Sequence, residues 1–301
     1  MCQSKNVLCT TAALVLMGLY GGHAGAQVPS TDVWLSELKG SGPELRVGPP
    51  ENVTRRAGYD NQPCFLPDGK GFLYTRGDSN GTDIYRYDRL QKRFVQITST
   101  PESEYSPTPL RDAGGDFCVV RVESDGAQRL WRFESDGSEP RLVTARVDSV
   151  GYFAWLDATI VAMFVVGEPH TLRVVDVATE RETVVASDIG RALHRIPERG
   201  GLSFLIRDKG SEPASFAFYT WGLDGAPPLH LIDAVGTSQD AAWIGDTLVM
   251  SDGTKLYAVR PFETPAWREV ADLGAYGLSG ITRLSVSPDG AWIAIVAAEA
   301  P

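Results

Sequence analysis

Histidine and cysteine are scarce in this chain of 301 residues, which contains four of each. Beyond the N-terminal segment the histidines are His170, His194 and His230, and no two stand at the i, i+2 or i, i+4 spacing of a metal-binding pair. The spacing of nucleophilic and acidic residues indicates no catalytic constellation either. We therefore expect no bound metal, no cofactor and no catalytic residue that the sequence alone can identify.

The chain also lacks a hydrophobic run of membrane-spanning length. The apolar stretch Val7 to Leu19 is shorter than the roughly 18 residues that a spanning helix needs. It follows Lys5, the only charged residue of the segment, and precedes the small residues Ala24-Gly25-Ala26, as in a secretory signal peptide. An uncleaved membrane anchor is the alternative. We expect residues 1–26 to be removed, leaving a periplasmic or secreted chain without stable membrane insertion.

Positive charge is under-represented, with 28 Lys and Arg against 38 Asp and Glu and a formal net charge of −10. Loss of Lys5 with the signal peptide moves the net charge to about −11. An acidic surface disfavours nucleic acid and anionic lipid as partners.

No long amphipathic helix and no low-complexity linker interrupts the sequence after residue 26. A two-strand unit recurs instead, with copies roughly 40 to 50 residues apart, which is the spacing of propeller blades. The copies begin near Val33, Ile84, Leu130, Leu172, Phe218 and Leu256. Each copy but the first follows an inner pair of apolar runs, and the unpaired inner pair stands at Ile281 to Ala298.

The copy around Ile84 shows the pattern best. A short apolar run, residues 61–66, leads into the turn Pro67-Asp68-Gly69, whose residues preset a turn dihedral, bond nearby backbone and accept a positive φ. Three further runs rich in aromatic and β-branched residues follow, at 71–75, 83–88 and 94–98. Four antiparallel strands in about 40 residues are typical of one blade.

These segments resemble the TolB-type propeller repeat, a relative of WD-type repeats. The resemblance rests on Leu66-Pro67-Asp68-Gly69 with Asp83-Ile84-Tyr85, and on Ser287-Pro288-Asp289-Gly290 with Ala291-Trp292-Ile293-Ala294. It extends over nearly the whole mature chain and implies a propeller fold. The family's namesake carries a separate α/β domain ahead of its propeller, for which we expect no room here.

We predict an all-β protein, a six-bladed β-propeller formed by residues 27–301 as a single domain. Strands near Asp32 to Leu38 and Leu45 to Val53 should pair with the C-terminal half-blade, which removes free sheet edges. We expect a monomer, with tryptophans such as Trp292 buried between blades.

The inner strands of a propeller converge on its axis, and the segments entering them surround the mouth of a channel. Mixed polar and aromatic residues at these entries make a candidate ligand-binding face. We select Asp60, Asn61, Tyr105, Tyr152, His194, Arg195, Asp240 and Arg283. His194 is the histidine we retain as a candidate ligand, because it lies beside Arg195 on an inner strand.

Two other features leave alternatives open. Gly77 to Gly81 matches a G-x-S-x-G nucleophile elbow, but the motif needs a helix after it and a strand is predicted there. Cys64 and Cys118 could form a disulfide between adjacent blades after export, or could be two small buried hydrophobic residues.

The sequence therefore favours an exported, non-catalytic propeller that binds a protein, peptide or envelope polymer through its axial face. The alternative is a propeller enzyme, a lyase or hydrolase that is metal-dependent or metal-free, with its site at the channel mouth.

Overall fold

The computed structural model describes residues 30–79, 81–111, 114–211 and 213–298. The signal peptide predicted in residues 1–26 lies outside this part. The described chain consists of β-strands and turns with two short 3-10 segments, η1 (Gly42–Glu44) and η2 (Gly274–Tyr276), so the all-β prediction is confirmed. No helix within these ranges has the length and apolar character needed to cross a membrane.

Four sheets contain four antiparallel strands each, and in each sheet the strands follow one another in chain order. The first has β8 (Ser103–Pro109), β9 (Phe117–Val122), β10 (Gln128–Phe133) and β11 (Arg141–Leu142). The second has β12 (Val150–Trp155), β13 (Ile160–Val165), β14 (Thr171–Asp176) and β15 (Arg181–Ser187). The third has β16 (Ile189–Arg195), β17 (Leu202–Arg207), β18 (Phe216–Trp221) and β19 (Leu229–Asp233). The fourth has β20 (Ala241–Ile244), β21 (Thr247–Asp252), β22 (Lys255–Arg260) and β23 (Thr264–Asp272).

A nine-stranded sheet joins the two ends of the described chain. Its main order is β24 (Arg283–Val286), β25 (Trp292–Ala298), β1 (Thr31–Lys39), β4 (Tyr59–Phe65), β5 (Gly71–Asp78), β6 (Gly81–Asp88) and β7 (Arg93–Gln96). The short strands β2 (Arg46–Val47) and β3 (Glu51–Asn52) also pair with β1. β1 pairs with β25 in antiparallel register from Thr31 opposite Ala298 to Glu37 opposite Trp292. A single parallel bridge, Thr31 to Tyr59, connects β1 to β4.

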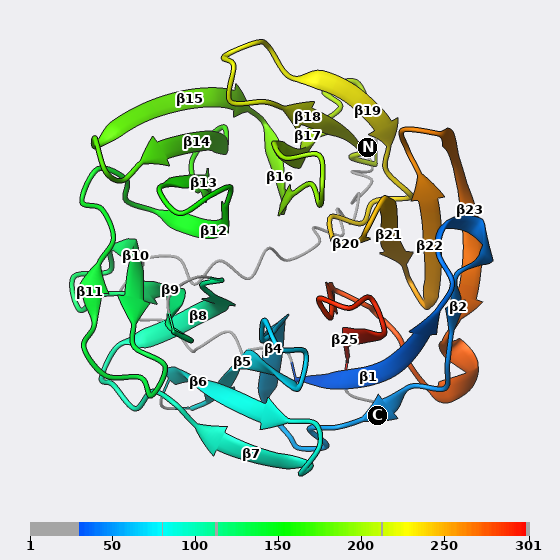
Figure 1. The fold of residues 1–301 in the computed structure, drawn as a ribbon, viewed down its shortest axis with the longest axis horizontal. Helices are drawn as coiled ribbons and strands as arrows, with labels where there is room; N and C mark the ends of the chain where they lie inside the picture. The colour runs from blue at the N-terminus through cyan, green and yellow to red at the C-terminus, as the bar shows by residue number, and fades with distance from the viewer. Residues whose placement is uncertain (1–29, 80, 112–113, 212, 299–301) are drawn as a thin grey trace, which may run out of the picture.

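The sheets are arranged radially around a common axis (Figure 1). The first strand of each repeat lies nearest the axis and the last lies on the outside, so β4, β8, β12, β16 and β20 surround the centre. β24 contacts both β4 and β20, which places the C-terminal strands between the first and last of these inner strands. The entries to the inner strands are therefore close together in space.

Turn chemistry explains why the repeats fold in this register. In the β4–β5 turn, Gly69 adopts a φ of +67°, and the carboxylate of Asp68 accepts a hydrogen bond of 3.0 Å from the backbone N–H of Lys70. The turn before β25 repeats this arrangement with Gly290 at +70° and Asp289 accepting from the N–H of Ala291 at 3.0 Å. Only glycine adopts such a φ without strain, so these turns fix the hairpin positions.

The segment that matches the nucleophile elbow belongs to a hairpin. β5 ends at Asp78 and β6 begins at Gly81, so a strand follows the motif. A nucleophile elbow needs a strand-to-helix turn. The turn interpretation of Gly77 to Gly81 is the one that the structure supports.

Cys64 and Cys118 are free thiols in the structure. Cys118 is fully buried among side chains of its own sheet and the next, including Val150, Phe153 and Met163. It therefore faces away from β4, the strand that carries Cys64. Burial raises the pKa of both thiols, to about 11 for Cys64 and about 12 for Cys118. Both residues fill space as small neutral side chains.

Trp292 differs from its predicted environment. It is half-buried, and packs partly against the cluster around Val33 and Phe72. The guanidinium of Arg89 lies 4.4 Å from the centre of its ring system. A cation stacked on an aromatic face covers the side that the core does not, so Trp292 bridges the core and the surface.

A substitution at Leu35 tests the pairing of β1 with β25. This β1 side chain is 6% exposed and packs in the same cluster as Ala294 of β25. We expect Leu35→Ala to lower the free energy of unfolding by about 2–5 kcal/mol, because it leaves a cavity within this cluster. Urea denaturation measures the change.

Leu90→Ala is the matched control, since Leu90 is 68% exposed. Its effect should stay within about 0.5 kcal/mol. Equal effects of the two substitutions would contradict the burial of β1.

Candidate axial binding site

Six side chains from six different inner segments form a polar and aromatic group at the axis, which we call the axial cluster. The cluster comprises Tyr59 (β4), Tyr105 (β8), Tyr152 (β12), Arg191 (β16), Asp240 (directly before β20) and Arg283 (β24). Hydrogen bonds and electrostatic interactions link its members across the sheets. The radial arrangement brings these residues together although they are far apart in sequence.

Asp240 binds two arginines at once. Its Oδ1 accepts hydrogen bonds from Nη1 of Arg283 at 3.0 Å and from Nε of Arg191 at 3.3 Å, and its Oδ2 pairs with Nη2 of Arg191. The Asp240 side chain is only 8% exposed. A carboxylate held by two guanidiniums in this way fixes both cations in position.

The backbone and a phenol complete the coordination of the arginines. The carbonyl of Thr282 accepts hydrogen bonds from Nη1 of Arg283 at 2.7 Å and Nη2 of Arg191 at 3.4 Å. Nη2 of Arg283 donates to the hydroxyl of Tyr152 at 2.8 Å, and its guanidinium lies 5.3 Å from the centre of that ring. Burial works to lower the pKa of Arg283, but the charge of Asp240, the phenols of Tyr152 and Tyr59 and the hydrogen bond to Asp240 together outweigh it, so the pKa lies above its ordinary value.

The phenol of Tyr59 remains neutral. Burial raises the pKa of Tyr59 far above its ordinary value, although the positive charge of Arg283 opposes this shift. Tyr152 and Tyr105 are close enough to contribute to the same shift. Neutral hydroxyls can donate as well as accept hydrogen bonds. The side chains of Arg191 and Arg283 keep 29% and 17% of their surface exposed, so a ligand at the axis could reach them.

Tyr105, Tyr152, Asp240 and Arg283 are predicted site residues that the structure brings together, whereas Tyr59 and Arg191 were missed. Tyr105, Tyr152 and Arg191 are each the third residue of their inner strand, and Tyr59 and Arg283 are each the first residue of theirs. These shared positions become visible only when the strand starts are known from the structure.

Arg195 does not join the axial cluster. It is exposed at the end of β16, where its Nε donates to the carbonyl of Leu156 in the neighbouring sheet at 3.0 Å. The register shift between Ile189 and Leu193 in the pairing of β16 with β17 separates it from Arg191.

His194 lies on β16 close enough to Asp240 to be affected by its charge. Burial lowers the pKa of its imidazole to about 4, and Asp240 opposes this shift. Its Nε2 is buried and has no hydrogen-bond partner among the described residues. The imidazole is therefore neutral at physiological pH and has an unused ring nitrogen. Across the described ranges, no group of three or more histidine, cysteine and acidic side chains is arranged to hold a metal ion.

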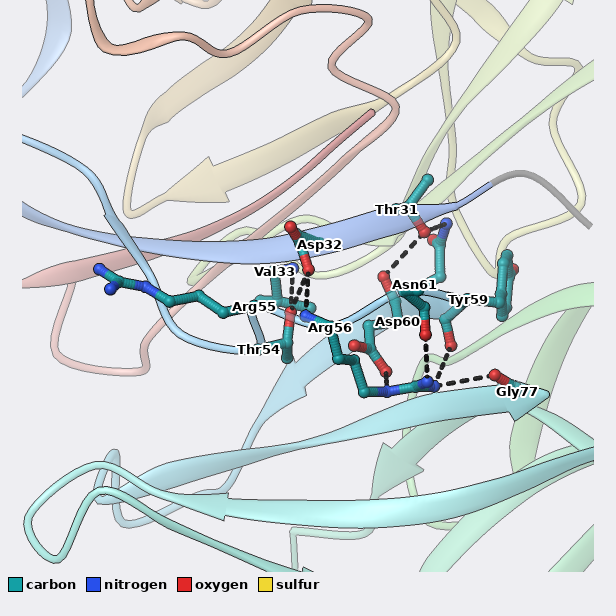
Figure 2. Close-up of polar contacts among 12 residues, drawn as sticks. Thr31, Asp32, Val33, Thr54, Arg55, Arg56, Tyr59, Asp60, Asn61 and Gly77 are labelled. Atoms are coloured by element: carbon teal, nitrogen blue, oxygen red, sulfur yellow. Dashed lines mark hydrogen bonds and ion pairs between the residues drawn. The ribbon is translucent and has the colours of Figure 1, made fainter. Parts of the chain in front are cut away.

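Asp60 lies at the junction of β1 and β4 rather than in the axial cluster (Figure 2). Its side chain is fully buried and accepts a hydrogen bond from Nε of Arg56 at 3.1 Å. Nη2 of the same arginine donates to the carbonyl of Gly77 in β5 at 2.8 Å. Tyr59 and Asp60 point to different sides of β4, as neighbouring strand residues do. Asp60 thus stabilises the junction.

Asn61 has a similar structural position. Its Nδ2 donates to the hydroxyl of Thr31 at 3.3 Å, and its Oδ1 accepts from the backbone N–H of Gln62 at 2.8 Å. The Thr31 hydroxyl donates in turn to the carbonyl of Asp60 at 3.0 Å (Figure 2). Asn61 is 6% exposed, so its polar atoms serve the contact between β1 and β4.

Radially arranged antiparallel sheets with polar residues gathered at the axis define a β-propeller. Comparison of the fold with solved structures identifies the propellers that it resembles: the fold is similar to that of TolB proteins. It matches a putative TolB from Agrobacterium tumefaciens with a TM-score of 0.67 and 16% identity, over 90% of this chain and 99% of that chain. It matches TolB from Acinetobacter baumannii with a TM-score of 0.58 and 13% identity, over 89% of this chain and 64% of that chain.

Propellers of other proteins share the fold. An oligogalacturonate lyase in complex with manganese matches with a TM-score of 0.55 and 12% identity, over 83% of this chain and 80% of that chain. No protein-family model and no curated protein matches the sequence. At these identities the likeness concerns the fold.

The buried Asp60 carboxylate should make stability depend on pH. Burial raises its pKa from 3.8 to about 6, so between about pH 4 and pH 6 the folded state holds a proton that the unfolded state has released. The free energy of unfolding contributed by this group therefore falls as pH rises through that window. In Asp60→Asn we expect this decrease in the free energy of unfolding, which is roughly 2–3 kcal/mol, to be absent. Urea denaturation at both ends of the pH window measures it.

The comparison must be made between variant and wild type, because His194 acts in the opposite direction. Because the pKa of His194 is lower in the folded state, the unfolded state binds a proton first as pH falls from about 6.5 to about 4. The free energy of unfolding that His194 contributes is lost over this range. An Asp60→Asn profile parallel to the wild type would refute the assignment.

Proposed function

We propose that this chain is an exported, non-catalytic β-propeller that binds a protein or peptide, or else an envelope polymer, through its axial face. The observation that carries the proposal is the axial cluster. Side chains from six inner segments meet there, and hydrogen bonds join Tyr152, Arg191, Asp240 and Arg283, while parts of Arg191 and Arg283 stay exposed. Hydrogen-bond donors that are already fixed beside aromatic rings suit ligand recognition, because these side chains lose little conformational freedom when a ligand binds.

Export is proposed from the segment Val7 to Leu19 with its flanking residues, which has the pattern of a signal peptide. The likeness in fold to TolB proteins supports a binding role in the same setting. We propose that the chain is a monomer. Because its net charge is −10, we also propose that it does not bind nucleic acid.

We further propose that the sheets make six blades, with the ring closed inside the nine-stranded sheet. In this view β4 to β7 form one blade, and β24, β25 and β1 with β2 and β3 form another. The pairing of β1 with β25, together with the single bridge between β1 and β4, supports this division. The contacts of β24 with β4 and β20 support the closure.

A second candidate function is enzymatic, as a lyase or hydrolase with its site at the channel mouth. His194 is the observation that favours it, because its imidazole is neutral and its Nε2 is unpartnered among the described residues. The fold likeness to an oligogalacturonate lyase in complex with manganese points the same way. Elemental analysis of the purified chain separates the two: a stoichiometric ion that is lost in His194→Ala would favour the enzyme.

Cross-linking tests the binding function. Residues 27–301 are incubated with envelope extract, cross-linked and analysed by mass spectrometry. We expect a saturable partner whose capture falls at least tenfold in Tyr105→Ala and Tyr152→Ala, because these residues present rings at the axis. Arg195→Gln is the matched control and should capture the partner normally. A partner captured equally by all variants would place the binding surface elsewhere.

Deletion of residues 31–53 tests the closure. The deletion removes β1 to β3 and leaves β25 without a partner on one side. We expect the single cooperative unfolding transition to be lost, as followed by calorimetry. An unchanged melting transition would contradict the closure.

A further inference from the structure

The axial cluster contains more positive than negative charge. Arg191 and Arg283 each carry one positive charge, and among the residues that the structure describes Asp240 is the only acid that either contacts by hydrogen bond or ion pair. The cluster thus has a net charge of about +1, because arginine stays protonated. This charge excess lies within a chain whose overall charge is −10.

Partly buried charges without a full complement of counter-charges cost free energy. Here the remaining contacts of the two guanidiniums are with neutral groups, the carbonyl of Thr282 and the hydroxyl of Tyr152. Neither group neutralises a full unit of positive charge. A bound monoanion would neutralise the excess charge of the axial cluster.

Donor groups remain available for such an anion. Nη1 of Arg191 and Nε of Arg283 make no hydrogen bond within the described part of the chain. The hydroxyl of Tyr152 accepts from Arg283, which leaves its own proton free to donate. Guanidinium N–H groups bind carboxylates strongly, and a phenol hydroxyl is a further donor.

We infer that the axial cluster binds the C-terminal carboxylate of a peptide or protein. One excess positive charge matches one terminal carboxylate, whereas a phosphate group carries more charge than the cluster can neutralise. An acidic polysaccharide carries a charge on every unit and would need an extended basic groove, which an acid-rich chain is poorly suited to offer. The rings of Tyr59, Tyr105 and Tyr152 would contact the side chains that precede the terminus. This inference rests on the proposed binding function.

The test uses a matched pair of ligands, N-acetyl-dialanine and its C-terminal amide, titrated into residues 27–301 by calorimetry or NMR. We expect the acid to bind at least tenfold more tightly than the amide at low ionic strength, and the preference to shrink as salt is added. Oligogalacturonate and inorganic phosphate are titrated in parallel. Tighter binding of either one would overturn the choice of a peptide terminus.

Three variants test whether the preference for the acid over the amide depends on the axial cluster. Arg191→Gln should weaken binding of the acid at least tenfold without changing that of the amide, while Arg191→Lys, which keeps the charge, should restore much of it. Arg195→Gln removes an arginine from the far end of the same strand and should bind like the wild type. Melting curves establish that each variant is folded. Equal losses in Arg191→Gln and Arg195→Gln would overturn the inference.

A failure of the carboxylate inference can be distinguished from a failure of the proposed binding function. If acid and amide bind equally and Tyr105→Ala abolishes both, the axial face binds ligands but does not recognise a carboxylate. If the acid does not bind even at millimolar concentration, the carboxylate inference is wrong, whereas the cross-linking experiment still decides whether the axial face binds a partner.

Discussion

The antiparallel pairing of β1 with β25 is the interaction on which the other sheets depend. It joins the first and last strands of the described chain and runs from Thr31 to Glu37 along β1. Through it, β24 is held between β4 and β20, so Arg283 reaches Asp240 and Tyr152. The geometry of the axial cluster is thus a consequence of how the chain ends meet. Polar contacts of Asp32, Asp60 and Arg56 reinforce the same junction (Figure 2).

Much of the fold could be predicted because turn residues and strand patterns are local. Pro67-Asp68-Gly69 and Pro288-Asp289-Gly290 specify their hairpins through a positive φ and a side-chain hydrogen bond, whatever surrounds them. Alternating apolar residues then define which strands have a buried face. The environment of Trp292 was less predictable, because its exposed face is covered by Arg89 from a distant part of the chain.

The candidate site was only partly predictable, for a physical reason. Which residue of an inner strand faces the axis depends on register, and a β-bulge changes the register without a clear sequence signal. The irregularity between Ile189 and Leu193 directs Arg191, rather than Arg195, to Asp240. Asp60 was chosen for its position at a strand entry, but it neighbours Tyr59 and so lies on the other side of the strand. Side-chain alternation decides between such neighbours, and sequence position alone does not.

The meeting of the chain ends has a consequence for how the molecule folds. During synthesis β1 is made first, yet the strand that covers its edge is made last. Until β25 is available, Val33 and Leu35 lack their contacts with Ala294 and Val296, and one row of backbone hydrogen-bonding groups of β1 remains unpaired. The contact is of very long range in sequence, which slows its formation and prolongs exposure to aggregation. The edge of β1 that β25 covers therefore stays open until the C-terminal strands are in place.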